Sequence, residues 1–417
     1  MPNGNKKNLY ITLIICFLTI FFGLGFCSSS RSIFLAPITD ALNISRSQFS
    51  LNETIRFSAT ALISMFFGDI LSKLGRRYVI LVGLLCYCLS SLLFAFAETI
   101  FAIYIAGAFL GIGTAFGSTA IISSIIKNSF GEKAGVINGV ILSANGIASA
   151  LASQIYTPII YSSIFGYKKA YIISALLVGI TFFATLFLFR ENPSKATTEK
   201  SVTLKTNSSE NFKLILRNAK FYLLIIFVFL TGFALQGITG IAAAHMVDIG
   251  VSPKFSGIAF SVFSFVLGFS KILIGFINDK FGVKISALLC HCCSITALLM
   301  LGVLEFLPHK SLISIFYALF AGIAVPLETI MLPFFSGGIF GYRFYDKIVG
   351  ILVGVNYIGS ALSLPVLNMV FDIMGSYTLI ILILCITMFF ITIGFQIMLN
   401  LRRDNYEGTN DWRPSGR

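Results

Sequence analysis

The stretch GDILSKLGRR at residues 68–77 decides the fold, because it returns in altered form as GFINDKFGVK at residues 275–284. Each copy has a glycine, three residues, a polar or acidic residue, a lysine, one residue, a second glycine and then basic residues. The first glycine lets helices pack closely, and the second permits a tight turn between two helices. The copies lie about half of the 417-residue chain apart, which predicts two related halves.

The composition around this repeat is typical of a membrane protein. The chain is 57% hydrophobic and 11% charged, and its mean hydropathy is +0.91. Soluble chains are about 45–50% apolar and about 25% charged. A water-soluble enzyme and a disordered protein are therefore excluded. The formal net charge of +13 indicates basic cytosolic loops rather than nucleic-acid binding.

Hydropathy and helix breakers predict an all-α membrane protein with twelve transmembrane helices. We expect an N-terminal six-helix bundle at 1–190, a cytosolic linker at 191–219, a C-terminal six-helix bundle at 220–400 and a cytosolic tail at 401–417. The spans are expected near 10–36, 50–71, 78–97, 101–126, 135–161, 167–190, 220–243, 255–277, 285–306, 311–337, 347–370 and 376–400.

The positions of the basic residues support this topology. With both termini in the cytosol, most of the 30 lysines and arginines fall in cytosolic segments, as expected for a multi-pass protein. The short loops and the high phenylalanine content favour a prokaryotic inner membrane. The exceptions are the external Arg46, Lys168, Lys169, Lys254 and Lys310, and Arg31, Arg56 and Lys271 inside spans.

With twelve spans, a central linker and the repeated loop motif, the whole chain resembles the major facilitator superfamily. The resemblance implies two six-helix bundles around a central cavity, and transport by rocking between two access states. Ser72 departs from the family pattern, which more often has Asp at this place, whereas Asp279 keeps it. The resemblance also implies a gate at the cytosolic surface, for which we expect Asp69, Lys73, Arg76, Arg77, Asp279 and Lys280.

The three cations inside spans carry the functional interpretation. Arg31, Arg56 and Lys271 would each cost about 2.5–3.5 kcal/mol in the membrane unless they face a wet cavity or a partner. Each also has a structural alternative. Arg56 can pair with Glu53, three residues before it on one helix face. Arg31 can extend to the outer surface, and Lys271 can pair with the buried Glu328.

A cationic excess in a low-dielectric cavity favours an anionic substrate such as a carboxylate. The chain resembles the branch of the oxalate:formate antiporter and the monocarboxylate transporters. There, a cation four residues before the motif glycine of helix 8 binds the substrate carboxylate, and Lys271 occupies that position. Asn356 stands where the oxalate antiporter has a second cation, which disfavours oxalate. Leu267 stands where monocarboxylate transporters have an acid, so Glu328 is the expected proton acceptor.

The predicted function is secondary active transport of a small organic anion, with a monocarboxylate favoured, by proton symport or as an anion antiporter. Lys271 is the expected main ligand, and Arg31 or Arg56 the second. Polar side chains on helices 5, 7 and 11 are expected to orient the anion by hydrogen bonds: Asn145, Gln236, Asn356 and Tyr357. We expect no cofactor, no metal, no nucleic-acid partner and no enzymatic activity.

The sequence leaves other substrate classes and one other function open. A zwitterion or a sugar acid could use Lys271 and Glu328 as opposite charges. Drug efflux is disfavoured, because helix 5 lacks the Gly-x-x-x-Gly-Pro signature of the drug–proton antiporters. A non-transporting membrane sensor is the remote alternative, since the 17 residues after the last span are few for an output domain.

Overall fold

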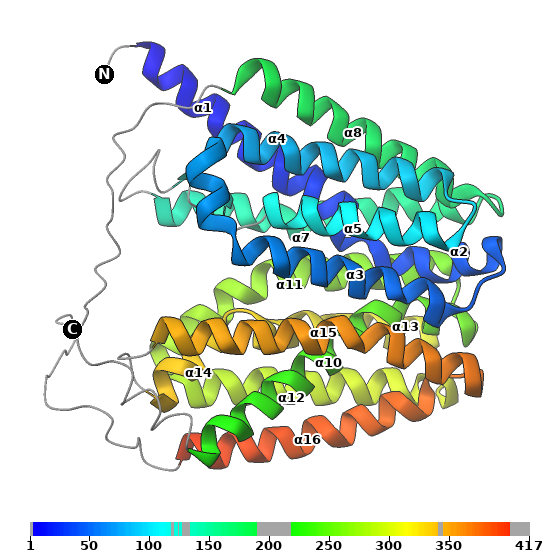
Figure 1. The fold of residues 1–417 in the computed structure, drawn as a ribbon. Coiled ribbons are helices and arrows are strands. Elements are labelled where there is room, and N and C mark those ends of the chain that lie inside the picture. The colour runs from blue at the N-terminus through cyan, green and yellow to red at the C-terminus, as the bar shows by residue number, and fades with distance from the viewer. Residues whose placement is uncertain are drawn as a thin grey trace, which may run out of the picture.

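The computed structural model describes residues 3–117, 121–123, 125–126, 134–189, 218–340 and 345–400, and these form helices joined by short turns (Figure 1). The first half contains α1 (Asn3–Leu18), the π-helix η1 (Thr19–Ser29), the 3-10 helix η2 (Arg31–Phe34), α2 (Leu35–Leu42), α3 (Arg46–Met65), α4 (Phe67–Phe96), α5 (Ile100–Phe116), α7 (Ala134–Ile160) and α8 (Gly166–Leu188). The second half contains α10 (Ala219–Asp248), α11 (Pro253–Phe281), α12 (Val283–Val303), η4 (Leu304–Phe306), α13 (Lys310–Ala324), η5 (Val325–Glu328), α14 (Met331–Phe340), α15 (Tyr345–Met374) and α16 (Thr378–Asn400).

The helices form two bundles that lie side by side, one from each half of the chain (Figure 1). Each bundle has its own apolar core of buried aliphatic and aromatic side chains. The start of α1 and the end of α16 lie at the same end of the bundles, on the left of Figure 1. We call this the proximal end and the opposite one the distal end.

Ten helical segments among the described residues are long and apolar enough to cross a membrane, and each matches a predicted span. The two remaining predicted spans are also helices, α3 and α7, but they are more polar. Helix α3 carries Arg46, Glu53 and Arg56, and α7 carries Asn145 and Gln154. Both helices lie against the other bundle, where polar side chains are tolerated, rather than facing lipid alone.

The first and tenth predicted spans are broken rather than continuous. The first changes from π-helix to 3-10 helix at Ser30, and the span continues to Leu42, beyond the predicted end. The tenth ends as an α-helix at Ala324 and passes through η5, which contains Pro326. Proline has no backbone N–H and interrupts a helix. Irregular backbone at membrane depth is tolerated where it lines a cavity, and the two breaks carry Arg31 and Glu328.

The repeated loop motif forms the expected turns. Gly75 and Gly282, the second glycine of each copy, have φ of 74° and 82°, which a residue with a side chain rarely adopts. The expected close packing at the first glycine is absent at Gly275, where an added Cβ would meet no atom within 4 Å. The proximal ends of the bundles are therefore not packed together around this glycine.

Four of the predicted gate residues, Lys73, Arg77, Asp279 and Lys280, make no hydrogen bond or ion pair between the bundles among the described residues. The side chains of Lys73, Asp279 and Lys280 are exposed. Arg77 instead donates to the backbone oxygen of Leu186 at 2.6 Å, in the last turn of α8 of its own bundle. A cation is favourable at a helix C-terminus. Arg76 is partly buried, and the side chain of Asp69 lies outside the described part.

The distal ends of the bundles, in contrast, are held together. The Arg46 guanidinium makes two contacts with the Asp248 carboxylate, at 2.5 and 2.8 Å, and donates to the Tyr377 hydroxyl at 3.2 Å. The backbone N–H groups of Arg46 and Ser47 donate to the two oxygens of Asp372, at 3.1 and 3.0 Å. A carboxylate from the C-terminal bundle thus caps the N-terminus of α3. We call these five residues the distal latch.

Further hydrogen bonds extend this closure along the interface. Asn368 donates to the Ser50 hydroxyl at 2.5 Å, and Thr54 to the backbone oxygen of Ala361 at 2.6 Å. On the other side, Gln154 of α7 donates to the Ser261 hydroxyl of α11 at 2.7 Å. Among the described residues, the ion pair between Arg46 and Asp248 is the only one that joins the two bundles.

Candidate functional site

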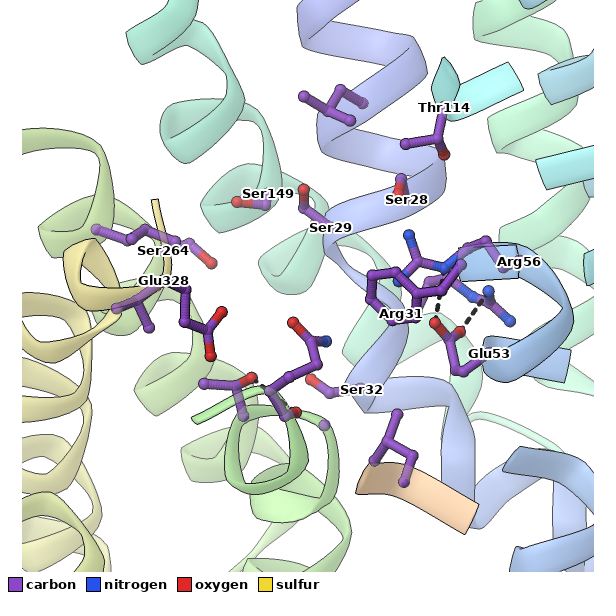
Figure 2. Close-up of a pocket in the computed structure, with 18 of the residues that line it drawn as sticks. Ser28, Ser29, Arg31, Ser32, Glu53, Arg56, Thr114, Ser149, Ser264 and Glu328 are labelled. Atoms are coloured by element: carbon purple, nitrogen blue, oxygen red, sulfur yellow. Dashed lines mark hydrogen bonds and ion pairs between the residues drawn. The ribbon is translucent and has the colours of Figure 1, made fainter. Parts of the chain in front are cut away.

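A cavity of about 300 Å³ lies between the two bundles. The N-terminal bundle contributes η1, η2, α3 and α7 to its wall, and the C-terminal bundle contributes α10, α11, η5 and α15. Figure 2 shows the charged side chains of the two bundles on opposite sides of this space. A cavity between helical bundles, lined by apolar residues and a few polar groups, is a common form of small-molecule site.

The most polar part of the wall is a set of three buried charged residues, Arg31, Glu53 and Arg56, which we call the arginine cluster. Nη1 of Arg31 lies 2.5 Å from Oε1 of Glu53, and Nε of Arg56 lies 2.7 Å from Oε2 of the same carboxylate. Their exposed fractions are 9%, 7% and 8%. Two guanidinium groups share one carboxylate, so the cluster carries one net positive charge.

Neither arginine depends on Glu53 alone for its position. Nη2 of Arg31 donates to Oδ1 of Asn52 at 2.5 Å, and its guanidinium lies 4.8 Å from the ring centre of Phe94. The guanidinium of Arg56 lies 4.0 Å from the ring centre of Phe57. Cation–π contacts of this kind are worth about 2 kcal/mol or more where water is excluded. The cluster is therefore a preorganised cationic surface.

The break in the first span places a serine-rich segment beside this cluster. Ser28, Ser29 and Ser32 line the cavity, and Ser29 donates to Oδ1 of Asn145 at 3.0 Å. The Ser32 hydroxyl is buried and has no hydrogen-bond partner in the described structure. A buried polar group without a partner is costly, so this hydroxyl is available to a bound molecule.

Glu328 lies on the opposite wall, at the end of the 3-10 helix η5 (Figure 2). Its Oε1 is buried and has no hydrogen-bond partner among the described residues. An ionisable group at membrane depth is expensive unless it is paired or hydrated. An unpartnered carboxyl oxygen in a cavity wall marks a place where a proton, a hydroxyl or an ammonium group can be accepted.

The structure brings most of the predicted substrate-binding and coupling residues to this cavity. Asn145, Gln236 and Tyr357 line it together with the arginine cluster and Glu328. The predicted pairing of Arg56 with Glu53 is present. The alternative in which Arg31 extends to the outer surface is wrong, because its side chain is buried and paired with Glu53.

Two predicted ligands lie elsewhere in the described structure. Asn356 is buried against Gly232, and its Nδ2 donates to the backbone oxygen of Val228 at 3.4 Å, so it joins α15 to α10. Lys271 is partly buried and does not line the cavity, whereas Leu267, one turn earlier on α11, does. No ion pair within 4.0 Å joins Lys271 to Glu328 among the described residues.

Sequence reasoning missed the contact between Arg31 and Glu53 and the distal latch. The first joins residues on different helical segments, η2 and α3, and the second joins residues of different bundles, since Arg46 and Asp248 are 202 positions apart. The signal that was present is the cost of burying charge. Arg46 is expected outside the membrane, where a cation requires no partner. Glu53 lies inside a predicted span and Asp248 lies close to the end of one, so each of these acids requires a partner.

Two bundles, broken helices and a cavity between the bundles with a few buried charged groups form the architecture of a membrane transporter. The family model of the Major Facilitator Superfamily matches residues 13–341, and the chain belongs to this superfamily.

Relatives and solved structures agree with this assignment. The chain is 22% identical over 413 residues to the uncharacterized MFS-type transporter YcxA of Bacillus subtilis (strain 168), covering 93% of this chain and 94% of that protein. It is 27% identical over 248 residues to the multidrug resistance protein MdtG of Rahnella sp. (strain Y9602), covering 57% of this chain and 55% of MdtG. It is also 27% identical over 248 residues to the nitrite extrusion protein of Bacillus subtilis (strain 168), covering 59% and 60%.

Solved structures of low sequence identity share the fold. The nucleoside transporter NupG superposes with a TM-score of 0.74 at 15% identity, over 95% of this chain and 100% of that one. A bacterial homolog of the human lysosomal transporter Spinster, in an inward-facing and unoccupied conformation, gives a TM-score of 0.66 at 16% identity, over 96% and 94%.

Proposed function

We propose that this transporter moves a small organic anion, a monocarboxylate, by alternating access. The observation that carries the proposal is the arginine cluster, which places one net positive charge in the wall of the cavity. An anion can be paired there in a low-dielectric site, whereas a cation would be repelled. Gln236, Asn145 and Tyr357 supply hydrogen-bonding groups around the same space.

The cations are ranked as ligands by whether their side chains line the cavity. Arg31 and Arg56 are the first ligands for the carboxylate, because both line the cavity and are held by aromatic rings. Lys271 ranks behind them, because it lies one helical turn nearer the proximal end than Leu267 and does not line the cavity in this state. This order reverses the sequence-based ranking, in which Lys271 came first.

Glu328 is the proposed coupling residue, by proton symport or by exchange of one anion for another. Its carboxyl group faces the cluster without a hydrogen-bond partner for Oε1. A proton on Glu328 removes a negative charge from the wall opposite the arginines, and this favours entry of an anion. Loss of that proton on the other side of the membrane would favour release.

The state described here is proposed to be the inward-facing one. If the basic loops are cytosolic, the proximal end faces the cytosol of a prokaryotic inner membrane, and the distal latch closes the outer side. Transport then requires the latch to open and the motif residues Asp69, Lys73, Arg76, Arg77, Asp279 and Lys280 to close the cytosolic side.

A zwitterion or a sugar acid is the second candidate. The observation that favours it is the position of Glu328 across the cavity from the arginine cluster, since a zwitterion can place one end on each. The relatives are named for multidrug resistance and for nitrite, and a structural neighbour for nucleosides, so their names do not select one substrate class.

The proposal is tested by thermal unfolding of the purified protein in detergent, with monocarboxylates, dicarboxylates, amino acids and cationic compounds at two pH values. A ligand at 100 times its Kd stabilises by about 2.7 kcal/mol. We expect stabilisation by a monocarboxylate and its loss in Arg31→Gln. Lys254→Gln removes an exposed cation outside the cavity and serves as the control. Stabilisation by cations alone would refute the proposal.

A further inference from the structure

We propose that Glu53 determines the charge of the transported molecule. It acts as a built-in carboxylate that neutralises one of the two cavity arginines and so restricts the site to monoanions. The inference rests on the proposed function and assigns to Glu53 a role in specificity rather than in packing alone.

The geometry of Glu53 is that of a bound carboxylate. Its two oxygens contact two different guanidinium groups, Arg31 at 2.5 Å and Arg56 at 2.7 Å. All three side chains line the cavity, and Figure 2 shows the carboxylate between the two arginines. An incoming carboxylate therefore meets two guanidinium groups, and Glu53 already neutralises half of their combined charge.

The arginines keep other partners if Glu53 loses its charge. Asn52 and Phe94 hold Arg31, and Phe57 holds Arg56. Because these contacts do not involve Glu53, the cationic surface can persist without it. The effect of Glu53 on a ligand is then mainly the negative charge that it contributes beside the binding groups.

The charged residues of the cavity wall also limit the ligand to one negative charge. Among the lining residues that the structure describes, the charged side chains are Arg31, Arg56, Glu53 and Glu328. The cluster can match one further negative charge. A second carboxylate on the ligand would stay unmatched in a low-dielectric space and would approach Glu328 on the opposite wall. A dicarboxylate is therefore excluded by charge even where it fits by size.

The test compares full-length variants that differ in the net charge of the arginine cluster. Kd values are measured by titration for three matched pairs of probes: butanoate with succinate, hexanoate with adipate, and benzoate with phthalate. The wild type, with one net charge, should prefer the monoanion of a pair. Glu53→Gln, with two, should shift the ratio of the two Kd values by about tenfold or more towards the dianion. Glu98→Gln removes an exposed carboxylate outside the cavity and should leave the ratio unchanged.

The double variant Glu53→Gln with Arg56→Gln returns the cluster to one net charge and should restore the wild-type preference. If Glu53→Gln alone does not fold, the comparison of Arg56→Gln, with no net charge, and the double variant tests the same rule. Arg56→Gln should bind monoanions weakly, and the double variant should recover them. An unchanged ratio in folded variants overturns the role of Glu53 while the anion function stands. Failure of the wild type to bind any monoanion overturns both.

Discussion

Removal of the Asp248 carboxylate is predicted to open the distal end of the transporter. Asp248 makes two contacts with the Arg46 guanidinium across the bundle interface, and Arg46 is 8% exposed. These contacts exist only while the distal ends touch. In Asp248→Asn, the free energy that they contribute is therefore lost from the closed state and not from the state that is open at the distal end.

The magnitude follows from the surroundings of the pair. Truncating one partner of a buried charge pair costs about 2–5 kcal/mol. The lower end applies here, because the Asp248 side chain keeps 26% of its exposure and Arg46 retains Tyr377 and the ring of Phe371 at 4.0 Å. A loss of about 2 kcal/mol changes the ratio of the two states by about thirtyfold.

The assay is a distance measurement by double electron–electron resonance. Spin labels are attached to cysteines introduced at Glu98 and His309, exposed distal positions on different bundles, after replacement of the eight native cysteines. Asp248→Asn should add a population with a longer distance. Glu305→Gln is the matched control, because Glu305 bonds Thr378 within one bundle. The same distance distribution in Asp248→Asn and wild type would refute the latch.

Three further predictions concern single residues. Gly146→Val should reduce uptake without loss of folded protein in detergent, because an added Cβ would lie 2.7 Å from the backbone oxygen of Ser264 in the other bundle; unchanged uptake would mean that this close approach is not needed. Glu328→Gln should retain exchange of substrate across proteoliposomes but lose accumulation driven by a proton gradient, and retained accumulation would exclude it as the coupling group. Asn356→Ala should lower the thermal midpoint by breaking its bond to Val228, yet leave substrate Kd within about twofold, and a large change in Kd would place it in the binding site.

The repeat and the hydropathy pattern predicted the fold because both follow from the membrane as solvent. Loop glycines, long apolar runs and basic loops are local signals, and they require no knowledge of how helices pack. The same reasoning identified Arg31, Arg56 and Glu328, since a charge at membrane depth needs a cavity or a partner. All three line the cavity in the structure.

The residues that sequence reasoning placed less well depend on helix packing. The spacing of Lys271 from Gly275 predicts a place for it at the substrate site, but Leu267, one turn away on α11, lines the cavity instead. Asn356 lies within a predicted span, which forms α15, but its side chain faces the neighbouring helix α10 and does not line the cavity. The pairing of Arg31 with Glu53 joins two helical segments. The sequence signals that a buried Glu53 needs a partner, but it does not signal that Arg31 is one of them.

Binding of an anion at the arginine cluster, and its passage across the membrane, are tested most directly by uptake of radiolabelled monocarboxylates into proteoliposomes. Uptake is measured with and without an imposed proton gradient, for the wild type and for Arg31→Gln. We expect the wild type to take up a monocarboxylate that stabilises it, and Arg31→Gln to lose this uptake while it stays folded. Equal uptake by the two proteins, or transport of cations and no anions, would contradict the proposed role of the cluster.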